Sequence, residues 1–273
     1  MPDSARAFVP GHVTGFFSAH PDDDPTKAGS RGAGLVIGDG VTVELEPGGG
    51  VELNGETATI EAVNRVLEAL RATAHVVVKT DLPLGAGFGV SGAAALGTAL
   101  ATNAVFGREL SENELVTIAH GAEVQAGTGL GDVVAQARGG VPIRLEPGAP
   151  AHGAMDGVPE HQSVEYRSFG ELSTEEIITG DTDDLTAAGN RALSALVSEP
   201  TLETFMSSSR RFGREAGLLT PKVEEVVRDV SDAGGEASMA MLGETVFALD
   251  SGLSDAGYDA ERCSVSLAGA HLL

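Results

Sequence analysis

A glycine-rich segment at residues 83–92 carries the sequence features best suited to chemistry. Four of its positions are glycine: Gly85, Gly87, Gly89 and Gly92. Glycine has no side chain to obstruct the backbone, so several N–H groups can turn toward one ligand. The segment leads into a helix predicted over Ala93–Val105, and the unpaired N–H groups and positive dipole of a helix start attract anions. Ser91 stands at the helix entry, where its hydroxyl can ligate Mg²⁺ or a phosphate oxygen, so the segment is a candidate site for a phosphate chain.

Other interpretations of this segment stay open. No Gly-Lys-Ser/Thr closes it, which excludes a Walker P-loop. It does contain Gly87-x-Gly89-x-x-Gly92, the spacing of dinucleotide-binding loops. In those loops the glycines follow a strand closely and an acidic residue ends the next strand, whereas here Asp81–Leu84 intervenes and a helix begins where that strand should end. A purely structural turn is the remaining alternative.

Two acidic residues flank a second glycine-rich segment at residues 127–131. Glu123 lies near the end of a predicted helix that starts with a capping box, in which Ser111 is the N-cap and Glu114 reaches back. Asp132 follows the glycines directly and opens a short predicted helix, Asp132–Arg138. A carboxylate beside a phosphate site can hold a divalent cation. The alternatives are a solvated helix face for Glu123 and an N-cap role for Asp132.

The elements that must position these residues alternate between strand and helix along the chain. Ala33–Ile37 and Val41–Glu46 are predicted strands that Gly38-Asp39-Gly40 joins as a hairpin. The other elements predicted before residue 150 are a helix at Thr59–Thr73 and strands at Val76–Thr80 and Val141–Leu145. A Pro-, Gly- and Ala-rich stretch, Pro147 to Glu160, is predicted to be a linker.

The second half repeats the mixture of helices and strands. Its predicted helices are Asp183–Val197, Thr201–Ala216 and Pro221–Ala233, and its predicted strands are Ser163–Phe169, Ala237–Leu242, Thr245–Leu249 and Arg262–Leu267. This order predicts an α+β protein with two layered halves, residues 1–150 and 151–273.

The composition restricts the classes of partner. The 273 residues include 17 Lys+Arg and 40 Asp+Glu, for a net charge of −23, which disfavours binding to nucleic acid or to an anionic membrane surface. Acids spread along the whole chain and few lysines suggest adaptation to a cytoplasm of high salt. Aromatic residues make up 4% and Trp is absent, so the core must be built from Ala, Val and Leu. The single cysteine, Cys263, cannot form an internal disulfide. We expect a cytoplasmic protein.

The first glycine-rich segment resembles the phosphate-binding motif of the GHMP kinases, Pro-x-x-x-Gly-Leu-Gly-Ser-Ser-Ala-Ala. The matching positions are Pro83, Gly87, Gly89, Ser91, Ala93 and Ala94. Two further segments occur in the order of that family. Val9–Gly15 resembles its opening motif, with His12 in place of the usual Lys or Arg, and residues 237–249 resemble its third motif, with most glycines replaced. The resemblance implies a GHMP kinase fold, with a ribosomal-protein-S5-domain-2-like N-terminal half and a ferredoxin-like C-terminal half.

The resemblance also implies roles for the candidate residues. ATP and Mg²⁺ are the implied cofactors, and the implied nucleotide-binding residues are Pro83, Gly85, Gly87, Gly89, Ser91 and Gly92. Ser91 and Glu123 are the implied metal ligands, and Asp132 is the implied acceptor of the substrate hydroxyl proton.

Four segments together resemble the archaeal branch of the family that phosphorylates pantoate on the route to coenzyme A. They are residues 10–17, Gly29–Gly34, Gly87–Gly92 and Gly127–Asp132. The carboxylate of pantoate needs a cation or N–H donors. Arg144 is the first candidate, His12 the second, and Ser18 and Arg31 are weaker candidates. A surface ion pair for Arg144 and a turn-capping role for His12 are the alternatives.

Several functional alternatives stay open. The chain could be a kinase of the same family that acts on homoserine, shikimate or mevalonate. It could be a nucleotide-binding regulator that has lost catalysis, as the altered third motif permits, or a Rossmann oxidoreductase. The expected partner is a small-molecule substrate, with no nucleic acid and no membrane. The oligomeric state is left open, with a homodimer as one option.

Overall fold

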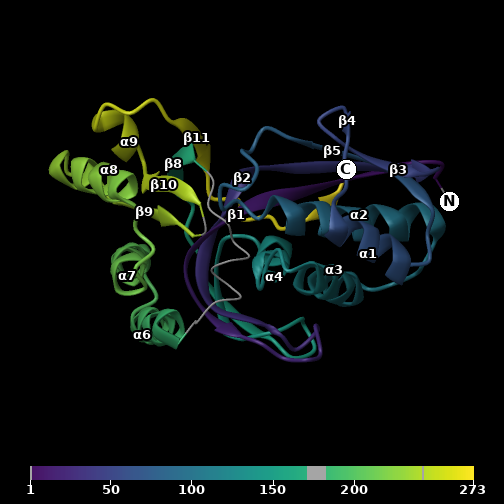
Figure 1. The fold of residues 1–273 in the computed structure, drawn as a ribbon, viewed down its shortest axis with the longest axis horizontal. Coiled ribbons are helices and arrows are strands. Elements are labelled where there is room, and N and C mark those ends of the chain that lie inside the picture. The colour runs from purple at the N-terminus through teal and green to yellow at the C-terminus, as the bar shows by residue number, and fades with distance from the viewer. Residues whose placement is uncertain (1, 171–182, 242) are drawn as a thin grey trace.

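The computed structural model describes residues 2–170, 183–241 and 243–273, which form two β-sheets with helices packed against them (Figure 1). Within these residues the larger sheet has eight strands in the order β12-β1-β2-β5-β3-β4, with β6 joined to β2 and β7 joined to β6. The strands of the larger sheet are β1 (Ala5–His20), β2 (Gly29–Pro47), β3 (Gly50–Leu53), β4 (Glu56–Thr57), β5 (Ala74–Thr80), β6 (Val141–Glu146), β7 (Ala154–Val158) and β12 (His271–Leu272). The smaller sheet has the order β11-β8-β10-β9. Its strands are β8 (Ser163–Gly170), β9 (Ala237–Ala240), β10 (Glu244–Leu249) and β11 (Glu261–Ser264).

The helices divide into two groups. The first group packs on the larger sheet: α1 (Glu61–Ala69), α2 (Val90–Phe106), α3 (Glu112–Ala126) and α4 (Asp132–Arg138). The second group lies with the smaller sheet and the adjoining part of β1 (Figure 1): α6 (Asp183–Ser198), α7 (Leu202–Glu215), α8 (Pro221–Asp232) and the short α9 (Gly252–Asp255). This arrangement confirms the predicted α+β class.

The longest strands, β1 and β2, pair with each other along nearly their whole length. The predicted hairpin at Gly38-Asp39-Gly40 is wrong, because β2 runs straight through it. Pro10 pairs with Gly40 and Gly11 pairs with Ile37, so the two extra residues between them form a bulge. Strand β1 pairs with β2 on both sides of this point and keeps it extended, and the turn-forming residues are absorbed as a local irregularity.

The predicted linker is also wrong. Within Pro147 to Glu160 lies β7, which pairs with β6 and so extends the larger sheet past residue 150. The chain returns to this sheet at its end, where β12 pairs with β1. The division into 1–150 and 151–273 stays a prediction, but β7 and β12 group with the first half.

Local signals predicted most helices well. The capping box of Ser111 and Glu114 is present at the start of α3, and α4 has the predicted bounds. Helix α2 begins at Val90, three residues before the predicted start, because Gly89 adopts a left-handed conformation as its N-cap. The predicted strand Ala237–Leu242 is observed as β9, and its last residue lies outside the described residues.

The core is built largely from small aliphatic side chains, as the composition predicts. One apolar cluster lies between the larger sheet and α1–α3, and a second lies between β1, the smaller sheet and α6–α8. A Cβ on Gly97 of α2 would lie 2.6 Å from Val43, so this helix approaches the sheet closely. Among the described residues, no helix combines the length and apolar character that crossing a membrane requires.

Candidate active site

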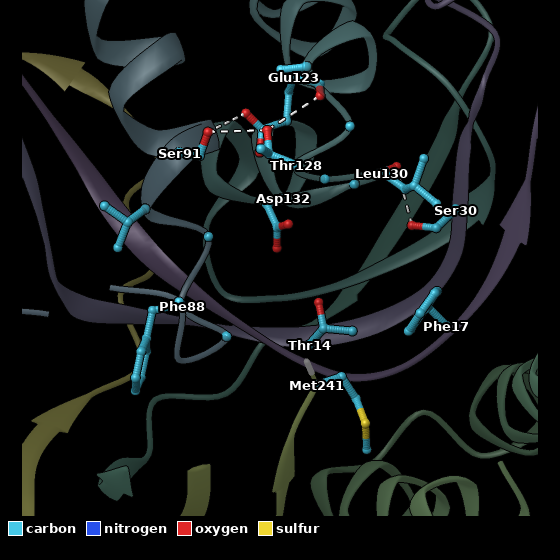
Figure 2. Close-up of a pocket in the computed structure, with 18 of the residues that line it drawn as sticks. Thr14, Phe17, Ser30, Phe88, Ser91, Glu123, Thr128, Leu130, Asp132 and Met241 are labelled. Atoms are coloured by element: carbon cyan, nitrogen blue, oxygen red, sulfur yellow. Dashed lines mark hydrogen bonds between the residues drawn. The ribbon is translucent and has the colours of Figure 1, made fainter. Parts of the chain in front are cut away.

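A pocket of about 270 Å³ lies where the two glycine-rich segments meet the β1–β2 ribbon (Figure 2). Residues far apart in the sequence contribute to its wall. The lining consists of Thr14, Phe17, Ser30, Gly85, Gly87, Phe88, Gly89, Val90, Ser91, Glu123, Ala126, Gly127, Thr128, Gly129, Leu130, Gly131, Asp132, Arg144 and Met241.

The first glycine-rich segment forms one side of the pocket. Gly85, Gly87 and Gly89 all have positive φ, a conformation that favours glycine. Helix α2 starts from Gly89 without a side-chain cap, so its first N–H groups are left for a ligand. The segment is therefore built as an anion site at a helix N-terminus.

Glu123, Ser91 and Thr128 meet at the α3 side of this helix start, as Figure 2 shows. The Ser91 hydroxyl donates to Oε2 of Glu123 at 3.0 Å and lies 3.2 Å from the Thr128 hydroxyl. Glu123 is 2% exposed. Burial, and secondly the negative charge of Asp132, raise the pKa of Glu123 to about 7. A buried carboxylate with this pKa is held ionised by a cation bound beside it.

The two carboxylates of the pocket enclose a space beside Gly129. A Cβ on this glycine would lie 2.8 Å from Oε1 of Glu123 and 3.1 Å from Oδ2 of Asp132. The described residues hold no group of three or more His, Cys, Asp or Glu suited to a metal. A hard cation at Glu123 and Ser91 therefore needs phosphate oxygens or waters as its other ligands, as Mg²⁺ commonly has in nucleotide sites.

Asp132 is the first residue of α4 and its carboxylate points into the pocket (Figure 2). Its Oδ1 lies 2.7 Å from Nδ1 of His12, which is fully buried in β1. Burial lowers the pKa of His12, so its neutral imidazole donates a hydrogen bond from Nδ1–H to Asp132. Burial alone would raise the pKa of Asp132, but this hydrogen bond and the charge of Arg144 outweigh it and hold the pKa below its usual range. Asp132 is therefore held as an ionised carboxylate whose orientation His12 fixes.

Arg144 forms the opposite side of the pocket. It lies in β6, where it pairs with Gly32 of β2, and it is 2% exposed. Its Nε and Nη1 have no hydrogen-bond partner among the described residues. Burial lowers the pKa of Arg144, but a guanidinium remains protonated at neutral pH. A buried cation with two unused donors is suited to bind a carboxylate.

Close backbone approach makes room for this arginine. A Cβ on Gly131 would lie 2.6 Å from the Ser30 hydroxyl and 2.7 Å from Nε of Arg144. Ser30 itself donates to the carbonyl of Leu130 at 3.3 Å. The second glycine-rich segment thus lies directly against Ser30 and Arg144.

Four of the predicted site residues do not line the pocket. Ser18 is buried and its hydroxyl lies 3.0 Å from Nε2 of His20. His12 lies behind Asp132, Pro83 precedes the lining glycines, and Gly92 faces Val133 of α4. Among the weaker candidates, Arg31 donates to the carbonyl of Leu145.

Three polar lining residues are not singled out by the sequence: Thr14, Ser30 and Thr128. Thr14 and Ser30 lie inside segments that carry the family resemblance, but the motif does not say which side chains face inward. Bulges in the β1–β2 pairing, one of them between Thr14 and Phe16, break the simple alternation of a strand. Thr128 could have been found as the polar residue between two glycines.

The third motif packs on the first glycine-rich segment. A Cβ on Gly87 would lie 3.1 Å from the carbonyl oxygen of Met241, and a Cβ on Gly243 would lie 2.3 Å from that of Ala86. Met241 also lines the pocket. The glycine that this motif retains therefore allows backbone contact with the phosphate-binding segment.

Comparisons with known proteins agree with this geometry. The GHMP kinases N terminal domain matches residues 57–140. Pantoate kinase of Methanocaldococcus jannaschii is 38% identical over 250 residues, covering 89% of this chain and 91% of that protein. Pantoate kinase of Thermococcus kodakarensis is 36% identical over 262 residues, covering 89% and 87%. A solved structure described as a phosphotransferase related to the CoA biosynthesis pathway superposes with a TM-score of 0.89 at 31% identity, covering 99% of this chain and 98% of the other.

Proposed function

The chain belongs to the pantoate kinase family of the GHMP kinases, and we propose that it transfers the γ-phosphoryl group of ATP to the 4-hydroxyl of pantoate. The product is 4-phosphopantoate, an intermediate on the route to coenzyme A. The enzyme is a phosphotransferase with an alcohol group as acceptor.

One observation carries the choice of acceptor. Arg144, a buried cation whose Nε and Nη1 have no hydrogen-bond partner among the described residues, lines the pocket that also contains Asp132 and the start of α2. Pantoate is a small anion whose carboxylate matches the guanidinium and whose hydroxyl supplies the nucleophile. Binding of the carboxylate at Arg144 leaves the hydroxyl end of the molecule to face Asp132.

We assign the phosphates of ATP to a site formed by the first glycine-rich segment and the start of α2. The uncapped N–H groups of α2 and the positive end of its dipole bind the phosphate oxygens. We assign Glu123 and Ser91 as the protein ligands of Mg²⁺. The metal neutralises charge that develops on the transferring phosphoryl group.

Asp132 is assigned as the general base. It accepts the proton from the acceptor hydroxyl while the oxygen forms a bond to the γ-phosphorus and the bond to the departing ADP oxygen breaks. His12 holds the carboxylate in place through its Nδ1–H. Because the pKa of Asp132 lies below its usual range, the base is ionised at neutral pH.

A substrate panel tests the assignment. Pantoate, homoserine, shikimate and mevalonate are each incubated with ATP and Mg²⁺, and release of ADP is measured. We expect turnover with pantoate to exceed turnover with the other three. Equal or faster turnover of homoserine would reject pantoate as the substrate, and ATP binding without turnover of any acceptor would favour a regulator.

We also propose a cytoplasmic location and adaptation to high salt for this enzyme. ATP is a cytoplasmic substrate, which supports a cytoplasmic location. The net charge of −23 supports adaptation to high salt, because screening removes the repulsion among the acids. Thermal unfolding measured from dilute buffer to molar KCl checks this, and full stability in dilute buffer would contradict it.

A further inference from the structure

Gln136 is a buried amide at the contact between α4 and the first glycine-rich segment. It lies four residues after Asp132, so the two side chains share one face of the helix. Gln136 is fully buried, and its Nε2 donates to the carbonyl oxygen of Gly89 at 2.9 Å. Its Oε1 has no hydrogen-bond partner among the described residues. A buried acceptor without a partner lowers the stability of the folded protein. Packing alone therefore does not explain why an amide, and not an apolar side chain, occupies this position.

Gly89 is the point at which this hydrogen bond reaches the phosphate-binding segment. Its φ of 63° and ψ of 31° place it in the left-handed region, and its carbonyl also accepts the N–H of Ala93. A Cβ on Gly89 would lie 3.0 Å from Cβ of Asp132 and 3.0 Å from Nε2 of Gln136. The backbone at Gly89 is therefore held against both side chains.

We propose that Gln136 is a positioning residue for phosphoryl transfer, whose amide holds Gly89 against the first turn of α4 and so fixes the distance between Asp132 and the bound phosphates. This inference rests on the proposed function, since it requires Asp132 to act on a hydroxyl that faces the nucleotide. Gln136 is too deeply buried to touch either substrate, and it acts through Gly89.

The substitution Gln136→Met tests this role, because it keeps the length of the side chain and removes the hydrogen bond. Thr98→Val is the matched control. Thr98 is fully buried in α2, and its hydroxyl donates to the carbonyl of Ala94 at 2.7 Å, away from the pocket lining. Should Gln136→Met not fold, Gln136→Leu replaces it, because this apolar side chain also lacks the donor.

The steady-state kinetics separate positioning from general loss of stability. Small displacements of reacting groups lower the rate of the chemical step more than they weaken substrate binding. We therefore expect Gln136→Met to lower kcat about tenfold. The KM for pantoate should change less than about twofold, because Arg144 is untouched. Thr98→Val should keep kcat within about twofold of the wild type. Equal losses of kcat in the two variants would overturn the proposal.

A double-mutant cycle tests whether Gln136 acts on the base. If it does, Gln136→Met should lower kcat about tenfold in the wild type and less than about twofold in the Asp132→Asn background. Equal factors in both backgrounds would overturn the proposal, because they would show that the two residues act independently.

Amide hydrogen exchange tests the contact without any turnover. We expect residues 85–92 to exchange faster in Gln136→Met than in the wild type, and Thr98→Val to leave this segment unchanged. Unchanged exchange in Gln136→Met would overturn the proposal even if the wild type phosphorylates pantoate. Faster exchange in Gln136→Met, together with a wild type that does not phosphorylate pantoate, would support the Gln136–Gly89 contact and reject the proposed function.

Discussion

At one end of the pocket Glu123 accepts a hydrogen bond from Ser91, whereas at the other end two nitrogens of Arg144 have no partner in the part of the chain that the structure describes. We call the first region, Ser91, Glu123 and Thr128, the nucleotide end, and the second, Ser30 and Arg144, the acceptor end. Both key side chains are 2% exposed, so burial does not distinguish them.

The difference lies in what each end needs from a ligand. At the nucleotide end, protein hydroxyls partly satisfy a carboxylate whose pKa burial raises to about 7, and a cation is needed to keep it ionised. At the acceptor end the charge is permanent, and only an anion with acceptor oxygens can pair the free donors. Asp132 lies between them, and its ionised form depends on Arg144 and His12. The two ends thus select opposite charges on either side of one base.

Asp132→Asn should have the largest effect, because it removes the proposed general base. The amide oxygen can still accept from Nδ1–H of His12, so the geometry should persist. We expect kcat to fall on the order of 10²-fold or more, with the KM values for ATP and pantoate little changed. Near-normal kcat in steady-state assays would show that Asp132 only orients or caps α4.

Glu123→Gln should change the pH dependence of stability in the absence of metal. An acid whose folded pKa is raised makes the folded state less stable as pH rises from its unfolded pKa to its folded pKa. The pKa moves from 4.5 to about 7, so the wild type should lose about 3 kcal/mol across this window and nothing further above it.

The measurement for Glu123 is denaturant unfolding of the metal-free protein between pH 4.5 and pH 8. Glu123→Gln should abolish this pH-dependent loss in the free energy of unfolding. The variant should therefore gain stability relative to the wild type as pH rises toward 7. A pH-independent difference between the two proteins would contradict the burial argument. Added Mg²⁺ should stabilise the wild type more than the variant.

Arg144→Ala tests the acceptor end. Loss of a buried charged hydrogen-bonding partner should cost about 2–3 kcal/mol of pantoate binding, or roughly 30- to 160-fold in kcat/KM for pantoate. Arg144→Lys is the matched variant, because it keeps the charge without the planar pair of donors, and its loss should be smaller. An effect confined to the KM for ATP would show that Arg144 belongs to the nucleotide end.

Ser91→Ala should have the smallest effect of these changes. It removes one hydroxyl at the nucleotide end and leaves Glu123 and the backbone N–H groups in place. We expect the KM for MgATP to rise about tenfold and the KM for pantoate to stay unchanged. Thr128→Val, which removes the neighbouring hydroxyl, provides the comparison. An increase in the KM for pantoate alone would contradict the division of the pocket into a nucleotide end and an acceptor end.

Local sequence signals predicted much of what lies within a few residues of each signal. The capping box at Ser111 and the short helix that begins at Asp132 both depend on neighbouring residues. The anion site ahead of α2 stays a prediction. The same reasoning failed at Gly38-Asp39-Gly40, because pairing of β2 with β1 outweighed a local turn signal. It also missed Ser30, because strand bulges decide which side chain faces the pocket.

By itself, the sequence determined which chemical groups were present and which segments carried them: glycine-rich turns, two acids and an arginine. Only the tertiary structure decided that His12 meets Asp132, 120 residues away, and that Arg144 is buried near them with two donors unpaired among the described residues. Turns and caps form from contacts between near neighbours, so a short stretch of sequence specifies them. Contacts between distant segments depend instead on strand register and on close backbone approach at glycines such as Gly34, where a Cβ would lie 2.3 Å from Nε2 of His12.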